Sequence, residues 1–240
     1  MYEFGYFNAD CMDGMKEFPD DFFDIAVCDP PYGLKAELVR DRGTYAKQSN
    51  GSKIWVSSEE YDNQDWDNET PGPEYFQELI RISKNQIIWG CNYFSFPLPG
   101  GRIIWDKCND GSDQSGAEIA YCSFNNRVDV IRYMWRGMMQ GKSIAEGTVQ
   151  QGNKALNEKR ITPTQKPIAV YKAILGKYTQ RGMKMIDTHV GSASSLIAAH
   201  ECGLRYVGFE ISPAIYQRSK ERLDAYTAQM SIYDLIETEE

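Results

Sequence analysis

Short apolar runs alternate with helical patterns along the chain, and this alternation constrains the fold more than any other feature. Seven runs have the length and apolar content of buried strands, at residues 24–29, 85–91, 101–106, 118–124, 128–135, 183–188 and 205–211. Helix signals of proline, serine or glycine mark four other segments, at 73–83, 167–178, 194–202 and 213–230. Strands interleaved with helices predict one α/β domain, residues 1–240, with a mainly parallel sheet.

Two long, polar, glycine-bearing stretches, 33–72 and 136–166, fit neither pattern. Inserted loops of that length in a compact domain usually carry function. The region 54–76, within and after the first stretch, is rich in aromatic residues: Trp55, Tyr61, Trp66, Tyr75 and Phe76. We expect these rings to pack on the core, with intercalation between nucleic-acid bases as the alternative.

Composition excludes several classes of protein. Six scattered cysteines without a CxxC pair, and only two histidines, argue for reduced thiols and against a disulfide framework or a zinc site. No apolar run approaches the ~20 residues that span a membrane, and the start MYEFGYFNAD lacks the regions of a signal peptide. We therefore expect a cytoplasmic protein with no membrane segment and no metal. Because the net charge is −8, contacts with nucleic acid would need local basic patches.

The sequence CDPPYG, at residues 28–33, follows directly after the first predicted strand. Ligands of α/β sheets bind beyond the carboxyl ends of the strands. The two prolines make a stiff exit from the strand, since proline fixes φ and donates no backbone hydrogen bond. Asp29 supplies an acceptor and Tyr32 a flat ring, a pair that suits a planar substrate bearing an amino group. A rigid turn with a surface tyrosine is the alternative reading.

A second motif spans residues 185–212 and reads as strand, small-residue loop, helix, glycine and strand. Gly191, Ser192 and Ala193 allow close approach of a ligand to the backbone, and Glu210 ends the next strand 23 positions after Asp187. An acidic residue about 20 positions on is where nucleotide-type sites hold a ribose hydroxyl pair. The fingerprint GxGxxG is absent, which disfavours a dinucleotide. An ordinary tight turn is the alternative for this motif taken alone.

The two motifs together, in this order, resemble the amino-methylating DNA methyltransferases of the N4/N6 family. The similarity is to the circularly permuted beta group, in which DPPY precedes the cofactor motif, and most of all to small phage-type adenine-N6 enzymes. It covers most of the chain: FNADCMDGM, FPDDFFDIAVCDPPYG, SKNQIIWGCNYF, TPTQKP, DTHVGSASS and GFEIS. The resemblance implies a Rossmann-like methyltransferase sheet with helices on both faces, permuted motif order and long inserted loops.

The resemblance further implies S-adenosylmethionine as cofactor. Glu210 would hold the ribose hydroxyls, and Asp10 with the Cys11 backbone would meet the adenine. Lys166 would lie near the methionine carboxylate. The methionine and ribose side would be lined by Asp187, His189, Gly191, Ser192 and Ser194, with Asp29 also beside the cofactor. Two positions depart from the family: His189 replaces the usual aromatic, and GSG is GSA here. A capping side chain is the alternative role for His189.

The same resemblance implies the catalytic residues Asp29, Pro30, Pro31 and Tyr32. The Asp29 carboxylate and the Pro30 carbonyl would accept the two amino protons of the target base and localise the nitrogen lone pair. The base must be flipped out of the duplex, and Tyr32 would stack on it. Cytosine-C5 enzymes need a cysteine after a proline, and no proline here precedes cysteine.

The predicted partner is double-stranded DNA. Residues 35–53 and 136–166 carry a local excess of lysine and arginine over acidic residues, which fits phosphate binding. A DNA-contacting loop is expected around 33–72 and a loop and target-recognition region around 107–166. The expected DNA contacts are Arg40, Arg42, Lys47, Arg136, Lys142, Lys154, Lys159 and Arg160. Incidental charge on a solvated loop is the alternative for each single residue.

The resemblance implies a prokaryotic or phage-encoded protein in a restriction–modification setting. Other functions compete with adenine-N6 methylation. Cytosine-N4 methylation has the same chemistry, and DPPY favours adenine over it only as a tendency. A catalytically silent, cofactor-dependent DNA-binding protein would not need Asp29 and Tyr32. Methylation of an amide nitrogen in protein or of RNA is disfavoured by the permuted order. Neither the target sequence nor the formation of a homodimer follows from the sequence.

Overall fold

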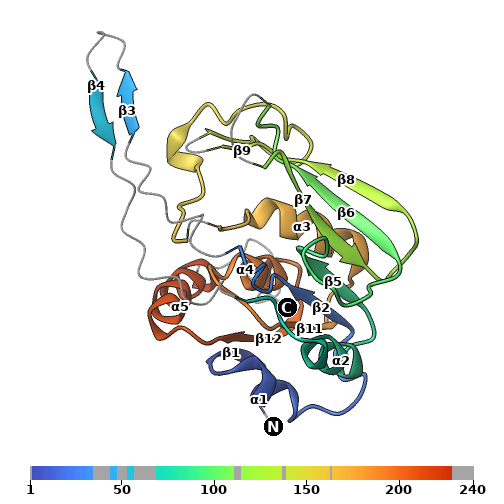
Figure 1. Cartoon of the computed structure of the whole chain (residues 1–240). Coiled ribbons are helices and arrows are strands. Elements are labelled where there is room, and N and C mark those ends of the chain that lie inside the picture. Colours follow the sequence, from blue (N-terminus) through green and yellow to red (C-terminus); the bar gives the residue numbers. More distant parts are fainter. Residues whose placement is uncertain are drawn as a thin grey trace, which may run out of the picture.

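The computed structural model describes residues 2–34, 44–47, 53–56, 69–110, 115–136, 139–162 and 164–228. In these residues one eight-stranded sheet forms the centre of the molecule (Figure 1). The strands, in the order in which they lie side by side, are β1 (Gly5–Asn8), β12 (Arg205–Glu210), β11 (Lys184–Asp187), β2 (Ile25–Cys28), β5 (Gln86–Trp89), β7 (Ala117–Cys122), β6 (Gly101–Asp106) and β8 (Val128–Arg132).

The sheet is mainly parallel, as predicted. All neighbours from β1 to β5 in this order run parallel, whereas β7 is antiparallel to both β5 and β6, and β8 is parallel to β6. All seven predicted strands are confirmed. β1 was not predicted, because its four residues GYFN form too short a run to stand out. The strand predicted at 128–135 ends earlier, at Arg132, and after two intervening residues a second short strand, β9 (Trp135–Arg136), begins.

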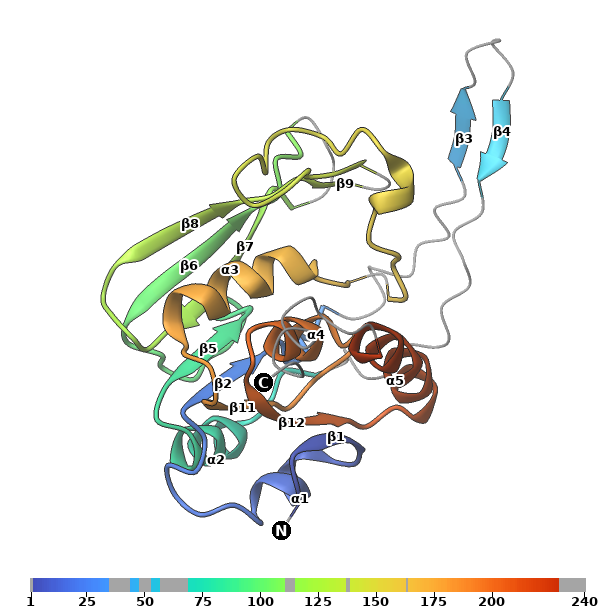
Figure 2. The same cartoon turned by 180° about the vertical axis from the view of Figure 1, so that it is seen from behind.

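Helices cover both faces of the sheet, which confirms the predicted fold class (Figures 1 and 2). Along β2, Ile25 and Val27 pack in the apolar cluster that includes α3 (Ile168–Tyr178), α4 (Ser194–Glu201) and Leu223 of α5 (Pro213–Thr227). The alternating residues Ala26 and Cys28 pack with α1 (Cys11–Met15) and α2 (Pro73–Ile82). This division follows from the period of two in a strand, where successive side chains point to opposite faces.

The helix ends follow the signals in the sequence. Pro73 and Pro213 occupy the first turns of α2 and α5, and the Ser212 hydroxyl caps α5 by accepting from the amide of Ile215. Gly203 follows α4 with a left-handed φ of 69°, a conformation that glycine adopts without steric cost. Pro167 was expected inside α3, but it is the capping residue and the helix begins at Ile168. The short helix α1 was not predicted.

Part of each polar stretch forms small elements outside the main sheet. In the first stretch, β3 (Thr44–Lys47) and β4 (Lys53–Val56) pair antiparallel and are drawn apart from the main sheet in both views (Figures 1 and 2). In the second, β9 pairs with β10 (Met139–Gln140), and a 3₁₀ turn covers Lys154–Leu156. None of the helices in the described ranges is long and apolar enough to cross a membrane.

Candidate active site

The sheet topology brings the two sequence motifs to one edge. β2, β11 and β12 are neighbours and parallel, so their carboxyl ends meet at the same side of the sheet. Asp29 follows β2, Thr188 follows β11, and Glu210 is the last residue of β12. The two motifs, which lie more than 150 positions apart in the chain, therefore form one site, as expected for an α/β sheet.

Asp29 lies in a network of direct contacts with Tyr32 and Lys166. Oδ1 of Asp29 accepts a hydrogen bond from the Tyr32 hydroxyl at 2.5 Å, and Oδ2 accepts one from Nζ of Lys166. Nζ also donates to the Tyr32 oxygen at 3.0 Å. The Lys166 side chain is only 2% exposed, and its Nζ lies 5.1 Å from the centroid of the Trp89 ring. Lys166 thus fixes the carboxylate and the ring of the DPPY motif.

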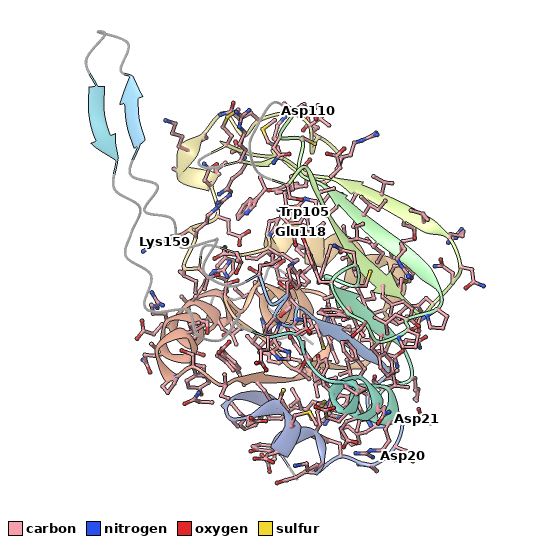
Figure 3. The ribbon with its side chains drawn as sticks, in the orientation of Figure 1. Asp20, Asp21, Trp105, Asp110, Glu118 and Lys159 are labelled. Carbon is pink, nitrogen blue, oxygen red and sulfur yellow. The ribbon has the colours of Figure 1, made fainter. Side chains whose placement is uncertain are left out.

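Two further charges extend this network and were not singled out in the sequence. Oε2 of Glu118, on β7, lies 2.9 Å from Nζ of Lys166, and its Oε1 lies 2.6 Å from Nζ of Lys107. Figure 3 shows Glu118 beside Trp105 in the interior. Glu118 stands in a run that was interpreted only as a strand, and nothing in its local pattern indicates a contact with residue 166.

Burial and pairing set the charge states of this network. Burial raises the pKa of Asp29, and the Lys166 cation offsets this only in part. Burial also raises the pKa of Glu118, but Lys166 and Lys107 outweigh it and bring that pKa down to about 2. For Lys166, burial lowers the pKa, yet the two carboxylates raise it more, so the lysine stays protonated.

The ring of Tyr32 belongs to an aromatic group. It stacks on Tyr93 with centroids 4.9 Å apart and meets the edge of Phe94. A side chain at Gly90 would place its Cβ 2.1 Å from the Tyr32 ring, so this position requires glycine. Tyr93 is 43% exposed. Tyr93 thus covers one face of the Tyr32 ring at the rim of the site, and this contact was missed from the sequence.

Asp187 holds the turn that follows β11. Its Oδ1 accepts from the backbone amide of His189 at 3.0 Å, and its Oδ2 accepts from the Ser195 hydroxyl. Burial raises its pKa to about 7. The turn itself is left-handed at Gly191 (φ 54°) and at Ala193 (φ 63°). Ala193 thus adopts a conformation typical of glycine, so the change from GSG to GSA leaves the turn in place.

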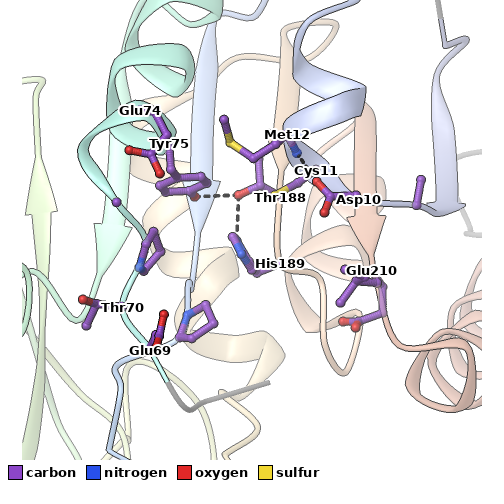
Figure 4. A pocket seen from close by; sticks show the side chains of 15 residues that line it. Asp10, Cys11, Met12, Glu69, Thr70, Glu74, Tyr75, Thr188, His189 and Glu210 are labelled. Atoms are coloured by element: carbon purple, nitrogen blue, oxygen red, sulfur yellow. Dashed lines mark hydrogen bonds between the residues drawn. The ribbon is translucent and has the colours of Figure 1, made fainter. Parts of the chain in front are cut away.

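A cavity of about 270 Å³ opens beside this turn (Figure 4). Four of the predicted cofactor residues line it: Asp10, Cys11, His189 and Glu210. Pro31 of the DPPY motif also lines it, which joins the two motifs at one wall. The remaining lining residues are Ala9, Met12, Glu69, Thr70, Pro71, Gly72, Glu74, Tyr75, Thr188 and Ile211. Asp187, Gly191, Ser192 and Ser194 lie next to these residues in the chain but are not among those that line the cavity.

The carboxylates at the cavity are oriented by backbone amides. Glu210 accepts from the amide of Gly191 at 3.0 Å and from that of Ser212 at 2.9 Å, and burial raises its pKa. Asp10 caps α1 by accepting from the amide of Met12 at 2.7 Å. A carboxylate oxygen has more than one lone pair, so both groups keep acceptor capacity for a ligand.

His189 is held as a neutral ring. Its Nδ1 lies 2.9 Å from the Thr188 hydroxyl, which lies 2.7 Å from the hydroxyl of Tyr75. Burial lowers the pKa of His189 to about 4, so the ring is uncharged at neutral pH and can stack as an aromatic. The core prediction is confirmed for Phe76 and for Tyr75, although Tyr75 also lines the cavity, a role that its sequence context did not indicate. The side chains of Trp55, Tyr61 and Trp66, for which the same prediction was made, lie outside the described part of the chain.

Ser192 and Ser194 face α5 and the second polar stretch. Arg222 donates to the Ser192 carbonyl and to the Ser194 hydroxyl, and its Nη2 lies 2.6 Å from Oε1 of Glu158. Glu158 also accepts from the amide of Ile168, the first residue of α3. The buried pair of Arg222 and Glu158 thus links the second polar stretch, the turn before α4, and the helices α3 and α5. Neither Arg222 nor Glu158 was predicted to have a role.

The predicted DNA contacts fall in several environments. Arg40 and Arg42 lie outside the described residues, and Lys47 ends β3. Arg136, Lys154 and Lys159 are exposed, with Lys159 labelled in Figure 3. Two others are engaged within the protein. Lys142 pairs with Glu146 at 2.9 Å, and the guanidinium of Arg160 lies 4.3 Å from the centroid of the Trp135 ring.

Comparison with known proteins finds relatives over nearly the whole chain. A family profile described as DNA methylase, of the N6/N4 type, matches residues 118–221. The putative methylase YubD of Escherichia coli K12 is 23% identical over 94% of this chain and 92% of its own length. The type II methyltransferase M2.MboI of Moraxella bovis is 20% identical over 93% of this chain and 89% of its own length.

Solved structures share the fold. The M1.HpyAVI–SAM complex is 14% identical, covers 90% of this chain and 98% of its own, and has a TM-score of 0.51. The putative DNA modification methylase TTHA0409 of Thermus thermophilus, complexed with S-adenosyl-L-methionine, is 14% identical with 94% and 95% coverage and a TM-score of 0.51. The cytosine-N4-specific PvuII DNA methyltransferase is 11% identical with 95% and 91% coverage and a TM-score of 0.52. The second half of the chain thus matches the N6/N4 DNA methylase profile, and the chain as a whole is distantly similar to type II DNA methyltransferases.

Proposed function

We propose that this protein transfers a methyl group from S-adenosylmethionine to an exocyclic amino group of DNA, and that the target is N6 of adenine. The observation that carries the proposal is the position of the DPPY segment. Pro31 forms part of the cavity wall, while Asp29 and Tyr32 stand beside it with their polar atoms in one network. The proposed sites for a nucleoside-like cofactor and for a planar amino-bearing base would thus share one border.

We assign the cavity to the adenosine part of the cofactor. Its walls supply flat and apolar groups at Pro31, Tyr75, His189 and Ile211, with carboxylates at Asp10 and Glu210. Glu210 would accept from the ribose hydroxyls and Asp10 from the adenine amino group. When bound, the cofactor supplies a methyl group on a positively charged sulfur. Asp187, Gly191, Ser192 and Ser194 remain our assignment for the methionine side.

The assignment of Lys166 to the methionine carboxylate is less compatible with the geometry. An ammonium group has three N–H donors. Nζ of Lys166 donates to Asp29 and Tyr32 and lies 2.9 Å from Oε2 of Glu118, so a cofactor carboxylate would compete with three oxygens already in contact with it. We therefore place Lys166 primarily with the catalytic segment.

Asp29 and the Pro30 carbonyl would accept the two amino protons of the target base. These bonds favour a pyramidal nitrogen with a localised lone pair, which can then attack the methyl group in line. Holding the two reactants in this geometry contributes ~7 kcal/mol or more. The base would be extruded from the duplex and would stack on Tyr32, in the place that the exposed Tyr93 ring takes against it in this structure.

Double-stranded DNA would be held by basic residues of the two polar stretches. Arg136, Lys154 and Lys159 are the best candidates among the described residues because they are exposed. Arg40, Arg42, Lys47, Lys142 and Arg160 complete the proposed set. Such contacts fix the register on the duplex and make binding salt-dependent. The protein would act in the cytoplasm of a prokaryote, in a restriction–modification or phage setting, as a monomer or a homodimer.

Cytosine N4 is the second candidate for the target. Its amino group would make the same two hydrogen bonds, and the fold is shared with a cytosine-N4-specific enzyme. The choice of adenine rests on DPPY alone. The general proposal is tested by incubating the protein with PCR-amplified genomic DNA, which carries no methylation, and S-adenosylmethionine labelled in its methyl group. Label in acid-precipitated DNA is expected; a folded protein that binds the cofactor but labels no DNA would favour the silent DNA-binding alternative.

A further inference from the structure

Four side chains of alternating charge form a line into the site: Lys107, Glu118, Lys166 and Asp29. We infer that Glu118 is a positioning residue for methyl transfer, which holds the Lys166 ammonium when Asp29 turns from the lysine to the amino group of the target base. This inference rests on the proposed function. It assigns a task to a residue that touches neither substrate nor cofactor and acts through Lys166.

The need for such a residue follows from the hydrogen bonds of Asp29. Oδ1 accepts from Tyr32 and Oδ2 accepts from Lys166, so both oxygens are engaged before a substrate arrives. Each oxygen has a second lone pair, so the amino group of a base can share Oδ2, but it then competes with Lys166 for that oxygen and weakens the hold of the lysine on Asp29. If Nζ of Lys166 withdraws, it becomes a buried ammonium in need of another acceptor, because an unpaired buried charge is strongly destabilising.

Glu118 has the geometry to receive the lysine. Its Oε2 is buried and already lies 2.9 Å from Nζ, yet it accepts no aligned hydrogen bond from any residue that the structure describes. Its other oxygen is anchored by Lys107 at 2.6 Å. A small rotation about the end of the lysine side chain turns the existing ion contact into a hydrogen bond, while the carboxylate itself stays in place.

During the reaction the Lys166 ammonium needs a charged acceptor a second time. As the nitrogen lone pair forms the new N–C bond, the C–S bond breaks and its electron pair passes to sulfur, which becomes neutral. The nitrogen, now cationic, gives one of its two protons to the Asp29 carboxylate. Asp29 is then neutral, and Glu118 is the carboxylate in contact with Lys166 that still carries a charge. When the product leaves, Asp29 returns the proton to water.

A purely structural role for Glu118 is the competing explanation, since an ion pair between β7 and the start of α3 can simply hold two elements together. The two explanations differ in the pH dependence of turnover. Groups from several packed elements act on Asp29: Tyr32, Glu118, Lys166, Tyr171 and Asp187. Within this set the negative charge of Glu118 disfavours ionisation of Asp29. Loss of that charge should therefore move the acid limb of kcat to lower pH.

The test is Glu118→Gln, which keeps size and removes charge. With PCR-amplified DNA and labelled S-adenosylmethionine, kcat should fall about tenfold or more, the scale of coupling within a charged network. The KM for S-adenosylmethionine should stay within about threefold, and the acid limb should shift to lower pH. Asp129→Asn is the matched control: Asp129 lies two strands away in the same sheet, pairs with Lys177 at 2.6 Å, and is 23% exposed against 19% for Glu118. It should leave kcat and the limb unchanged.

Unchanged turnover and an unmoved acid limb in Glu118→Gln would overturn the inference while leaving the proposed function intact, because the wild type would still methylate DNA. A fall in kcat without a shift of the limb would also overturn it in favour of the structural role. If Glu118→Gln does not fold, Glu118→Asp replaces it. This variant keeps the charge, but its shorter side chain moves the carboxylate away from Lys166, so kcat should fall by a smaller factor than expected for Glu118→Gln. A wild-type kcat in Glu118→Asp would then contradict the inference.

Discussion

Oδ2 of Asp29 accepts a hydrogen bond from Nζ of Lys166, although 137 positions separate the two residues. Asp29 is the first residue after β2, and Lys166 immediately precedes the cap of α3. The contact therefore joins the carboxylate of the DPPY motif to the last residues of the second polar stretch. It places a fixed positive charge beside the group that we assign to the target base.

Asp29→Ala should reduce methyl transfer at least about hundredfold, because the amino group loses the acceptor that orients its lone pair. Calorimetry with a cofactor product analogue and mobility shift with DNA should both remain within a few fold of the wild type. These binding measurements confirm that the variant is folded. Near-normal turnover would show that DPPY is only a turn.

Glu210→Ala should weaken binding of S-adenosylmethionine by about 1–3 kcal/mol, since the ribose hydroxyls lose a charged acceptor. Titration calorimetry without DNA measures this directly. Glu201→Ala is a suitable control, because Glu201 ends α4 and pairs with Lys172 away from the cavity. Equal affinity in the wild type and Glu210→Ala would remove Glu210 from the cofactor site.

Cofactor binding should depend on pH because of the carboxyl group of Asp187. Burial raises its pKa to about 7 from an ordinary value near 3.8. Between these two pH values the carboxyl group of Asp187 is therefore protonated in the folded protein and ionised in the unfolded chain. The sign for stability follows: the contribution of Asp187 is greatest below the unfolded pKa and is lost as the pH rises to about 7. A cationic cofactor beside Asp187 favours its ionised form, so affinity should rise with pH up to about 7 and then level off.

Calorimetry in buffers of different ionisation enthalpy should detect a proton released on binding at pH 6. Asp187→Asn, which keeps an acceptor for the amide of His189, should abolish this release and flatten the profile between pH 5 and 7. A wild-type affinity that is independent of pH would place the cofactor cation elsewhere.

Tyr32→Ala should lower turnover strongly, whereas Tyr32→Phe should keep much of it, because stacking uses the ring face. Some loss in the phenylalanine variant is expected, since the hydroxyl also contacts Asp29 and Lys166. A mismatch at the target pair should restore part of the alanine loss, as an unpaired base is easier to extrude. With 2-aminopurine at the target, the alanine variant should fluoresce more than the wild type. Equal fluorescence and equal rates would mean that the ring touches no base.

The sequence was sufficient for the parts of the site that depend on local patterns. Asp29, Asp187 and Glu210 each follow or end a strand of clear apolar character, so topology alone brings them to one edge. The contacts of Glu118, Glu158 and Arg222 could not be predicted, because each joins segments far apart in the chain. β1 was missed because it is short and lies at the edge of the sheet, where its pairing with β12 defines it.

The central claim is methylation of an amino nitrogen in DNA, and nucleoside analysis tests it most directly. DNA from cells expressing the wild-type protein and DNA from cells expressing Asp29→Ala would be digested to nucleosides and measured by mass spectrometry. The account predicts N6-methyladenine in the wild-type sample and its absence from the Asp29→Ala sample. N4-methylcytosine in its place would overturn the choice of base, and no methylated nucleoside in either sample would contradict the account as a whole.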